Sequence, residues 1–377
     1  MKKSDLKTWI LTLNAGSSSI KYSLFQYKGK LRVEEKGMVE KIGEESSYFE
    51  KSGGRKIKVK ARNHGQALGV ILKDLLGKID SPSSLYGVGH RVVHGGEKFK
   101  DSVIINSRVL KTVKKFSHLA PLHNPPAIVV ISACMNLLKS VPQVAVFDTS
   151  FHQTIPERAF IYALPYKFYT RYRIRRYGFH GTSHRYVTIE AARRLGKDVS
   201  SLKLITCHLG NGCSITAVDK GKSVDTSMGF TPLEGLVMGT RCGDIDPAII
   251  FYLAQRGYKL EEIEEILNRK SGLLGISGIS NDMRIVEKKM GKGNRRAKIA
   301  YEVFVYRLAK YISAYLGILG GADAVVFTAG IGEHQRRVRE DVKKILNPIL
   351  RKCGTRILVI PTNEELMIAK EVLRLLK

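Results

Sequence analysis

Two stretches of this chain repeat one pattern, and the repetition constrains the fold more than any other feature of the sequence. Residues 11–30 read LTLNAGSSSIKYSLFQYKGK, and residues 204–222 read LITCHLGNGCSITAVDKGK. In both, an apolar run typical of a strand leads through a turn of small residues into a second such run, which ends at KGK. The chain is therefore predicted to contain two related halves, each of which opens on a pair of strands.

The small residues at these turns suit an anion. Glycine lets backbone N–H groups approach a ligand closely, and short hydroxyl side chains add hydrogen-bond donors. A third turn of this kind follows a strand-like run in the carboxyl half, AVVFTAGIGEH at 324–334. Phosphate is the ligand that such turns favour.

Length and patterning indicate a two-domain α/β protein. The 377 residues exceed the size at which one hydrophobic core usually stops growing, and strand-like runs alternate with helical ones. Strands are expected at 8–14, 20–27, 143–148, 203–209, 213–219, 324–330 and 356–361. Helices are expected at 107–118, 126–139, 183–195, 260–269, 295–319 and 363–376, and in the longest the apolar residues recur close to the helical period.

Charge is the unusual feature of the composition. The chain has 63 Lys and Arg against 34 Asp and Glu, a net charge of +29. Such an excess is compatible with nucleic acid, acidic lipid or anionic substrates as partners. The basic residues are spread over separate groups, and no nucleic-acid-reading motif accompanies them. A solvated basic surface is therefore favoured over nucleic-acid binding as the main role.

The sequence also bears on where the protein works. No apolar run approaches the roughly 20 residues that cross a bilayer, and the lysines of the amino end precede a short apolar run that reads as a strand. The five cysteines lack paired spacing, which is typical of reduced thiols rather than of disulfides. We expect a cytoplasmic protein without a membrane segment.

Common nucleotide and zinc motifs do not fit. The GKS at 221–223 lacks the P-loop glycine five positions earlier, where Thr216 stands, and GIGEHQ lacks the last glycine of a dinucleotide fingerprint. Two histidine pairs have a spacing that can hold zinc, although neither encloses the glutamate of HExxH. They are His90 with His94 and His180 with His184.

A longer set of motifs resembles the acetate kinase family in order and spacing. The matching blocks are LNAGSSSIK, GHRVVHGGE, PLHNPP, FDTSFHQTIP, YGFHGTSHRYV, HLGNGCS, DTSMGFTPLEGLVMGTRCGDIDP, SGLLGISGISNDMR, FTAGIGEH and VIPTNEELMIA. The resemblance extends from about Trp9 to the carboxyl end. It implies the actin-like, sugar-kinase-like (ASKHA) α/β fold, with two duplicated ribonuclease-H-like domains around a cleft.

This resemblance also implies different functions for the two domains. Residues 1–150 with a C-terminal helix at 366–377 are expected to form the acyl-substrate and phosphate domain. Residues 151–365 are expected to form the nucleotide-binding and dimerisation domain of a homodimer. The implied reaction is reversible, direct in-line phosphoryl transfer between ATP and acetate, giving acetyl phosphate and ADP, with Mg²⁺ as cofactor and Mn²⁺ as the alternative. Propionate or another short-chain carboxylate is the alternative acceptor, and a basic nucleic-acid-binding protein on the same fold is the less favoured alternative.

Four residues in the matched blocks are expected to be catalytic. By resemblance, Arg91 and Arg241 bind the carboxylate and the migrating phosphoryl group, since a planar guanidinium suits both anions. His180, in YGFHG, is expected to donate to the phosphoryl oxygens as the transition state spreads its charge. Asp148 is expected to hold the arginines or metal-bound water, because a carboxylate acceptor is already ionised at neutral pH and offers no proton to a base.

The remaining site residues also follow from the resemblance. Asn14 and Glu364 resemble the polar pair that positions Mg²⁺. The acyl group is expected among residues beside the catalytic blocks, namely Arg91, Val93, Leu122, His123, Phe179 and Pro232. The phosphates and the nucleoside of ATP are expected at Ser17, Ser18, Ser19, Lys21, His208, Leu209, Gly210, Asn211, Gly212, Asp282, Met283, Arg284, Gly330, Ile331, Gly332, Glu333 and His334.

The chain departs from the family pattern at three places. The family usually has Asn where His334 stands, which bears on the nucleotide contacts of that loop. It usually has Ser where Cys242 stands, and its connection between Arg339 and Leu358 is longer. Neither of these last two departures involves an expected catalytic residue.

Overall fold

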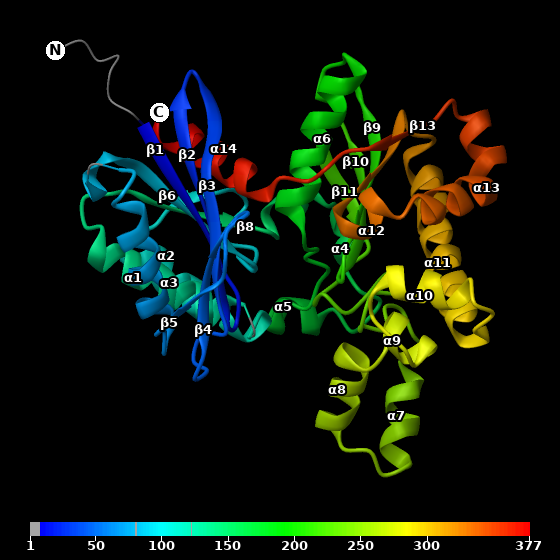
Figure 1. Cartoon of the computed structure of the whole chain (residues 1–377). Coiled ribbons are helices and arrows are strands. Elements are labelled where there is room, and N and C mark those ends of the chain that lie inside the picture. Colours follow the sequence, from blue (N-terminus) through cyan, green and yellow to red (C-terminus); the bar gives the residue numbers. More distant parts are fainter. Residues whose placement is uncertain (1–7, 80, 122) are drawn as a thin grey trace. The chain divides into compact units, whose positions relative to one another are not determined.

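The computed structural model describes residues 8–79, 81–121 and 123–377 (Figure 1). The chain divides into two compact units: unit 1 is Met1–Ser150 with Asn363–Lys377, and unit 2 is Phe151–Thr362. The last helix of the chain thus belongs to unit 1, and the chain returns to that unit at Asn363 rather than at residue 366. The functions that we expect of the two domains stay a prediction.

Unit 1 is built on a mixed sheet in the order β5-β4-β3-β2-β1-β6-β8-β7. Its strands are β1 (Thr8–Ala15), β2 (Ser19–Lys28), β3 (Lys30–Glu40), β4 (Ser47–Lys51), β5 (Ile57–Val59), β6 (Leu85–Val92), β7 (Val103–Ile104) and β8 (Gln143–Phe147). Its main helices are α1 (His64–Leu75), α2 (Ser107–Lys115), α3 (Asn124–Leu137) and α14 (Glu364–Leu376). Strands β1, β6 and β8 are parallel, so their carboxyl ends lie at one edge of the sheet.

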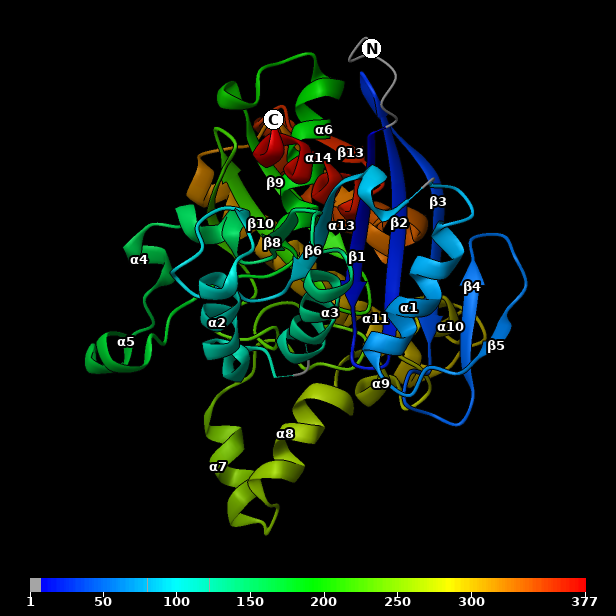
Figure 2. The same cartoon turned by 90° about the vertical axis from the view of Figure 1, so that its left-hand side faces the viewer.

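Helices cover both faces of this sheet, because successive side chains of a strand point to opposite sides. Leu11 and Leu13 of β1 are buried in a cluster with Ile71 of α1, and Figure 2 shows α1 and α3 side by side over the sheet. Ile10, which directly precedes Leu11 and so points to the opposite face, is buried in a second cluster with Ile368 of α14. Alternation along one strand therefore fixes which helix packs on which face.

Unit 2 repeats this plan. Its sheet has the order β11-β10-β9-β12-β13, with β9 (Lys203–Leu209), β10 (Cys213–Asp219), β11 (Lys222–Thr226), β12 (Ala324–Thr328) and β13 (Arg356–Val359). The β9–β10 and β10–β11 pairs are antiparallel, and β9–β12 and β12–β13 are parallel. The β3-β2-β1-β6-β8 part of unit 1 has the same order and directions. The duplicated α/β fold expected from the two sequence repeats is confirmed.

The helices of unit 2 vary widely in length. They are α4 (Glu157–Phe160), α5 (Lys167–Tyr172), α6 (Gly181–Leu195), α7 (Ala248–Gln255), α8 (Leu260–Arg269), α9 (Gly272–Ser277), α10 (Met283–Met290), α11 (Arg295–Leu319), α12 (Ala329–His334) and α13 (Arg336–Lys352). The longest, α11, begins at the side-chain cap of Asn294 and ends at Gly320 in the left-handed conformation. None of the helices among the described residues has both the length and the apolar character that crossing a bilayer requires.

Candidate active site

The polar centre of unit 1 is an arginine bound to a carboxylate. Arg91 lies on β6, and Asp148 directly follows the parallel neighbouring strand β8, so the sheet brings them together. Arg91 donates to Oδ2 of Asp148 from Nε at 3.0 Å and from Nη2 at 2.5 Å. Asp148 is 1% exposed. Because one carboxylate oxygen accepts from two nitrogens, the guanidinium is held in a fixed plane.

Two further polar side chains face the same arginine. Asn14, near the end of β1, accepts from Nη1 of Arg91 at 3.4 Å. Glu364, the first residue of α14, lies 3.8 Å from Arg91 Nε. Burial would lower the pKa of Arg91, but the charges of Asp148 and Glu364 outweigh it and raise that pKa. Burial also raises the pKa of Glu364, an effect that the Arg91 charge opposes and the Asp148 charge reinforces.

The donors in this centre fit a hard divalent cation. Asn14 offers an amide oxygen and Glu364 a carboxylate oxygen, which are the ligand types that Mg²⁺ prefers. The described residues contain no cluster of three or more His, Cys, Asp or Glu side chains with a metal-binding arrangement. A cation held by one or two protein oxygens, water and phosphate is the arrangement typical of Mg²⁺ bound with a nucleotide.

The serine-rich turn joins β1 to β2. Gly16 N donates to Ser19 O at 2.8 Å, and His64 Nε2 lies 2.8 Å from Gly16 O, which fixes the turn against α1. Ser17 and Ser18 are exposed. Lys21 pairs with Asn14 across the hairpin and lines a separate cavity of about 240 Å³ in unit 1. The turn thus leaves Ser17 and Ser18 exposed on a rigid base.

In unit 2, the corresponding hairpin between β9 and β10 carries the expected phosphate residues. Gly210 N donates to Gly212 O at 3.0 Å, which closes the turn. A Cβ atom built on Gly212 would lie 3.4 Å from Arg241 Nη1 and 3.5 Å from His180 Nε2. The two side chains therefore converge on the space directly above Gly212, which this residue leaves open because it has no side chain.

His180 occupies a conformation that few residues adopt. It precedes α6 with φ 54°, in the left-handed region, where non-glycine residues concentrate at functional sites. Its ring stacks on that of His208, with centroids 4.1 Å apart. His208 in turn contacts Ser183 Oγ through Nδ1 at 2.8 Å. The backbone strain and the stacked neighbour together fix the direction of the His180 ring.

Arg241 differs from Arg91 in its surroundings. Among the described residues no carboxylate lies within ion-pair distance of it, and its hydrogen-bond partners are Pro232 O at 3.4 Å and Met238 Sδ at 4.0 Å. Burial lowers the pKa of Arg241. A half-buried cation whose neighbours are a carbonyl and a thioether has its charge available for an anion.

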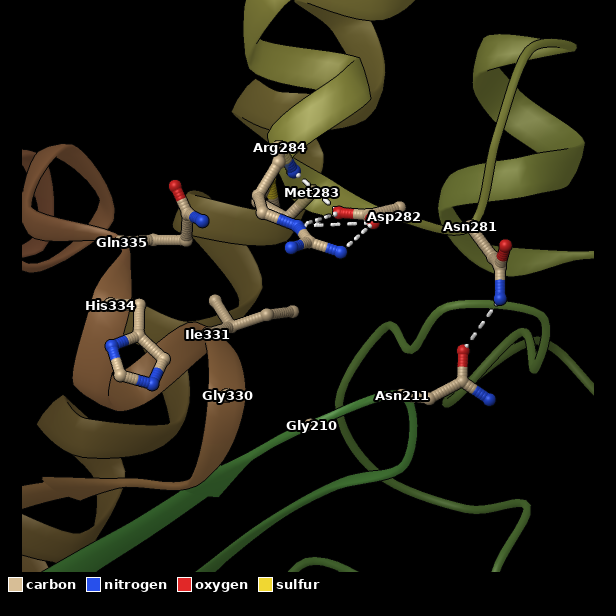
Figure 3. A pocket seen from close by; sticks show the side chains of 10 residues that line it. All are labelled: Gly210, Asn211, Asn281, Asp282, Met283, Arg284, Gly330, Ile331, His334 and Gln335. Carbon is tan, nitrogen blue, oxygen red and sulfur yellow. Dashed lines mark hydrogen bonds and ion pairs between the residues drawn. The ribbon is translucent and has the colours of Figure 1, made fainter. Parts of the chain in front are cut away.

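Beside this hairpin lies a cavity of about 440 Å³, the larger of the two described here. Figure 3 shows the residues that line it, from the hairpin turn, from the start of α10 and from α12. Arg284 forms an ion pair with Asp282 at 2.6 Å, and Asn281 Nδ2 donates to Asn211 Oδ1 at 2.9 Å. The lining residues are Gly210, Asn211, Asn281, Asp282, Met283, Arg284, Gly330, Ile331, His334 and Gln335.

Most residues expected to contact ATP in unit 2 thus border one cavity. Glu333 does not line it: its Oε1 accepts from Ala329 N at 2.8 Å and from Thr362 N at 3.2 Å, so it holds the backbone of α12. Leu209 and Gly332 are buried beneath the same segment. Neither Asn281 nor Gln335 was expected, although each directly adjoins a block that was.

The expected acyl-pocket residues divide between the two units. Val93 is half-buried just after β6, and His123 is the residue before α3 in unit 1. Phe179 is buried in unit 2, and its carbonyl lies 2.9 Å from His152 Nε2. Pro232 is half-buried and contacts Arg241 as described. Leu122 lies outside the described residues.

Comparison with known proteins agrees with this geometry. The family model described as "Acetokinase family" matches residues 9–350. A curated acetate kinase from Halothermothrix orenii is 49% identical over 396 residues, covering 98% of this chain and 99% of its own. The crystal structure of Porphyromonas gingivalis acetate kinase has a TM-score of 0.92 at 41% identity, over 98% of this chain and all of that chain (100%). A propionate kinase from Francisella tularensis has a TM-score of 0.89 at 42% identity, over 98% and 100% of the two chains.

The fold and these similarities define a phosphotransferase whose phosphoryl acceptor is a carboxylate. Within that class the chain belongs to the acetokinase family. Kinases of this kind generally require a divalent metal ion. The family that the sequence motifs indicated is therefore confirmed.

Proposed function

We propose that this protein catalyses the reversible, Mg²⁺-dependent transfer of the γ-phosphoryl group of ATP to acetate, which gives acetyl phosphate and ADP. An acetate oxygen attacks the γ-phosphorus in line, the bond between that phosphorus and the β,γ-bridging oxygen breaks, and ADP leaves with the electron pair. The protein has little covalent chemistry to perform, so alignment and charge neutralisation dominate catalysis. Mn²⁺ is the alternative metal.

The observation that carries this proposal is that two side chains, Arg241 and His180, face the same space over Gly212. Arg241 has no carboxylate partner among the described residues, and its Nη1 edge and the Nε2 edge of His180 face one small space. We infer that the migrating phosphoryl group occupies this space. Donors already in place stabilise the charge that develops on the equatorial oxygens without a later reorganisation.

Arg91 has a different role in this account. Its charge is partly matched by Asp148, which fixes the guanidinium plane, and we infer that Arg91 orients the acetate carboxylate. Asp148 acts through this arginine rather than as a base, because an ionised acetate has no proton to give up. Asn14 and Glu364 would hold Mg²⁺, which when bound neutralises charge on the β- and γ-phosphate oxygens.

The nucleotide is assigned to unit 2. We propose that the cavity of about 440 Å³ takes the nucleoside, with Ile331 on one side and Asp282 and Arg284 on another. Its volume suits a ligand of that size. The hairpin turn at Gly210–Gly212 then directs the phosphates toward Arg241. For Ser17–Ser19 and Lys21 of unit 1, the family resemblance implies phosphate binding, and we keep this as their proposed role.

The acyl acceptor is the part of the proposal with a second candidate. The propionate kinase of similar structure favours propionate as the alternative, while half-buried Val93 favours acetate because a stiff β-branched side chain leaves room for little more than a methyl group. We further propose that the protein works as a cytoplasmic homodimer. Nucleic-acid binding by this basic protein stays a less favoured alternative to the kinase activity.

Trapping of the acyl phosphate tests the function directly. Purified protein is incubated with MgATP, hydroxylamine and acetate, propionate or butyrate, and the hydroxamate is measured. We expect acetohydroxamate to form fastest, with propionate as a secondary substrate and butyrate a poor one. Absence of hydroxamate with all three acids would contradict the proposed function, and preference for propionate would assign the second candidate acceptor.

A further inference from the structure

A row of buried polar side chains lies behind His180 in unit 2. His180 Nδ1 is 2.9 Å from Ser214 Oγ, and His184 Nε2 is 2.7 Å from the same oxygen. On its other side, His184 Nδ1 is 2.7 Å from Thr206 Oγ1. His180 directly precedes α6 and His184 lies in its first turn, and the two hydroxyls come from the neighbouring strands β10 and β9. His184 and Ser214 lie within matched motifs, but the resemblance implied no role for either of them, and the proposed reaction uses neither them nor Thr206.

The row has a single direction of hydrogen bonding, and Thr206 sets it. The Thr206 side chain is fully buried, and in the part of the chain that the structure describes His184 Nδ1 is the one polar atom that its hydroxyl contacts. A buried hydroxyl hydrogen without an acceptor is costly, whereas an unused lone pair is tolerated better. Thr206 therefore donates to His184 Nδ1, which must carry no hydrogen.

The hydrogen bond from Thr206 also decides which nitrogen of His184 carries a hydrogen. His184 is fully buried, and burial, reinforced by the nearby His152 and His208, places its pKa well below the ordinary value. The ring is therefore neutral and carries its one hydrogen on Nε2. That hydrogen is donated to Ser214 Oγ at 2.7 Å. The Ser214 hydroxyl then uses its own hydrogen for the remaining partner, His180 Nδ1.

We propose that Thr206, His184 and Ser214 form a relay of hydrogen bonds that fixes the neutral His180 ring with its hydrogen on Nε2. This edge of the ring faces the space above Gly212 that it shares with Arg241. His180 is thus kept as a hydrogen-bond donor at the position where, resting on the proposed function, the phosphoryl group lies. A ring with hydrogen on Nε2 has no lone pair there, so it neither removes a proton nor attacks phosphorus through that atom. The three relay members are positioning residues.

The relay makes a prediction about kinetics as well as structure. A donor that acts on developing charge should affect turnover more than substrate binding. Loss of the Thr206 hydroxyl leaves His184 Nδ1 without its donor, so both imidazoles become free to exchange tautomers. We expect Thr206→Val to lower kcat about tenfold or more while KM for acetate and for ATP changes little.

The tautomers themselves are measured by NMR on protein with ¹⁵N-labelled histidine, through the two-bond correlations that distinguish hydrogen on Nδ1 from hydrogen on Nε2. His180→Gln and His184→Gln variants assign the two rings among the ten histidines. In the wild-type protein at neutral pH we expect both rings to be neutral with hydrogen on Nε2. Hydrogen on Nδ1 of either ring, or a doubly protonated His180, would overturn the proposal.

Matched variants separate the relay from a general structural effect. Thr206→Ser keeps the hydroxyl and should keep the tautomers and turnover. Thr216→Val removes a buried hydroxyl from the residue paired with Thr206 across the strands, but Thr216 contacts Thr226 instead of a histidine, so it should also behave as wild type. If Thr206→Val leaves the His180 tautomer and kcat unchanged, the relay is wrong.

The relay and the proposed function fail in different ways. Predicted tautomers in a protein that forms no acyl phosphate would leave the relay standing and remove the function. Normal acyl-phosphate formation with His180 protonated on Nδ1 would support the function and rule out the relay. If Thr206→Val does not fold, the wild-type spectrum alone still decides between the two proton arrangements.

Discussion

Arg91 donates from two nitrogens to one oxygen of Asp148, at 3.0 Å from Nε and 2.5 Å from Nη2, while its Nη1 faces Asn14 at 3.4 Å. One carboxylate thus fixes the plane of the guanidinium. Arg241, in the other unit, has no such partner among the described residues. The two arginines of the proposed site are therefore not equivalent: one is held in place and the other keeps its charge for a ligand.

Removal of either arginine should abolish most of the activity without unfolding the protein. Arg91→Ala and Arg241→Ala each remove charge that the transition state needs most, so each should cost about 3 to 4 kcal/mol, roughly a hundredfold to a thousandfold in turnover. Initial rates measure the effect, and circular dichroism checks the fold. Arg193→Ala, at an exposed arginine of α6, is the control. Wild-type rates in either active-site variant would refute the assigned roles.

A methyl group added at Gly239 should weaken ATP binding selectively. The new Cβ would lie 2.0 Å from Asn211 Oδ1, so the Asn211 side chain must move and lose its bond to Asn281 beside the cavity. The loss of one hydrogen bond predicts a threefold to tenfold rise in KM for ATP, about 1 kcal/mol, with KM for acetate unchanged.

Gly317→Ala is the matched control for Gly239→Ala, because open space surrounds Gly317 on α11. This variant should bind ATP as the wild type does. An unchanged KM for ATP in Gly239→Ala would show that the hairpin turn does not contribute to the nucleotide site.

Stability should fall as the solution is acidified below neutrality, in part through His90. Burial lowers the pKa of His90 to about 4, while the hydrogen bond to Gln143 opposes this shift. The unfolded chain, with a histidine pKa of about 6.5, therefore binds a proton that the folded chain does not between these two values. The free energy of unfolding should decrease by about 1.4 kcal/mol for each pH unit from 6.5 down to about 4 on account of this residue.

Denaturant unfolding between pH 7 and pH 4 tests this, with His90→Gln compared with the wild type. In this pH range, unfolding of the variant should take up about one proton fewer than unfolding of the wild type. His118→Gln, at an exposed histidine, should keep the wild-type pH dependence. An identical pH slope in His90→Gln and the wild type would show that His90 does not contribute.

Val93 should limit the size of the acid. Val93→Ala enlarges the expected acyl pocket, so KM for propionate and butyrate should fall more than KM for acetate, with kcat little changed because the arginines remain. A methylene group in an apolar pocket contributes only about 1 to 3 kcal/mol, so the selectivity should shift rather than invert completely. Steady-state kinetics with the three acids measure this. If the variant keeps the wild-type ranking, Val93 does not line the pocket.

The sequence predicted the longest helix and both hairpins, but it missed several helices, among them α1 and α13. The long helix expected at 295–319 is α11, and each of the two predicted hairpins forms around its small-residue turn. Strand β6 was not predicted as a strand, because glycines interrupt its apolar pattern. The reason lies in tertiary packing: a Cβ at Gly89 would lie 2.4 Å from Ile368 Cγ2 of α14, a residue far away in the sequence.

The residues of the site were likewise only partly predicted from the sequence. Arg91, His180 and Arg241 were expected because the motifs that contain them resemble those of the acetate kinase family. No role was expected for Ser214, although it ends the motif HLGNGCS, or for Thr206, which lies outside the motifs; both are ordinary members of β-strands. Their importance depends on the register between β9 and β10 and on the packing of α6 against that hairpin, and no local pattern encodes a hydroxyl that meets two imidazoles.

Transfer of an oxygen label tests the central claim most directly. The protein is incubated with MgATP and acetate labelled with ¹⁸O at both oxygens, and hydroxylamine then cleaves the product at the acyl carbon. Attack of the carboxylate on the γ-phosphorus predicts one ¹⁸O atom in the released inorganic phosphate and none in ADP. Phosphate without label, or label in AMP with release of pyrophosphate, would contradict phosphoryl transfer to the carboxylate.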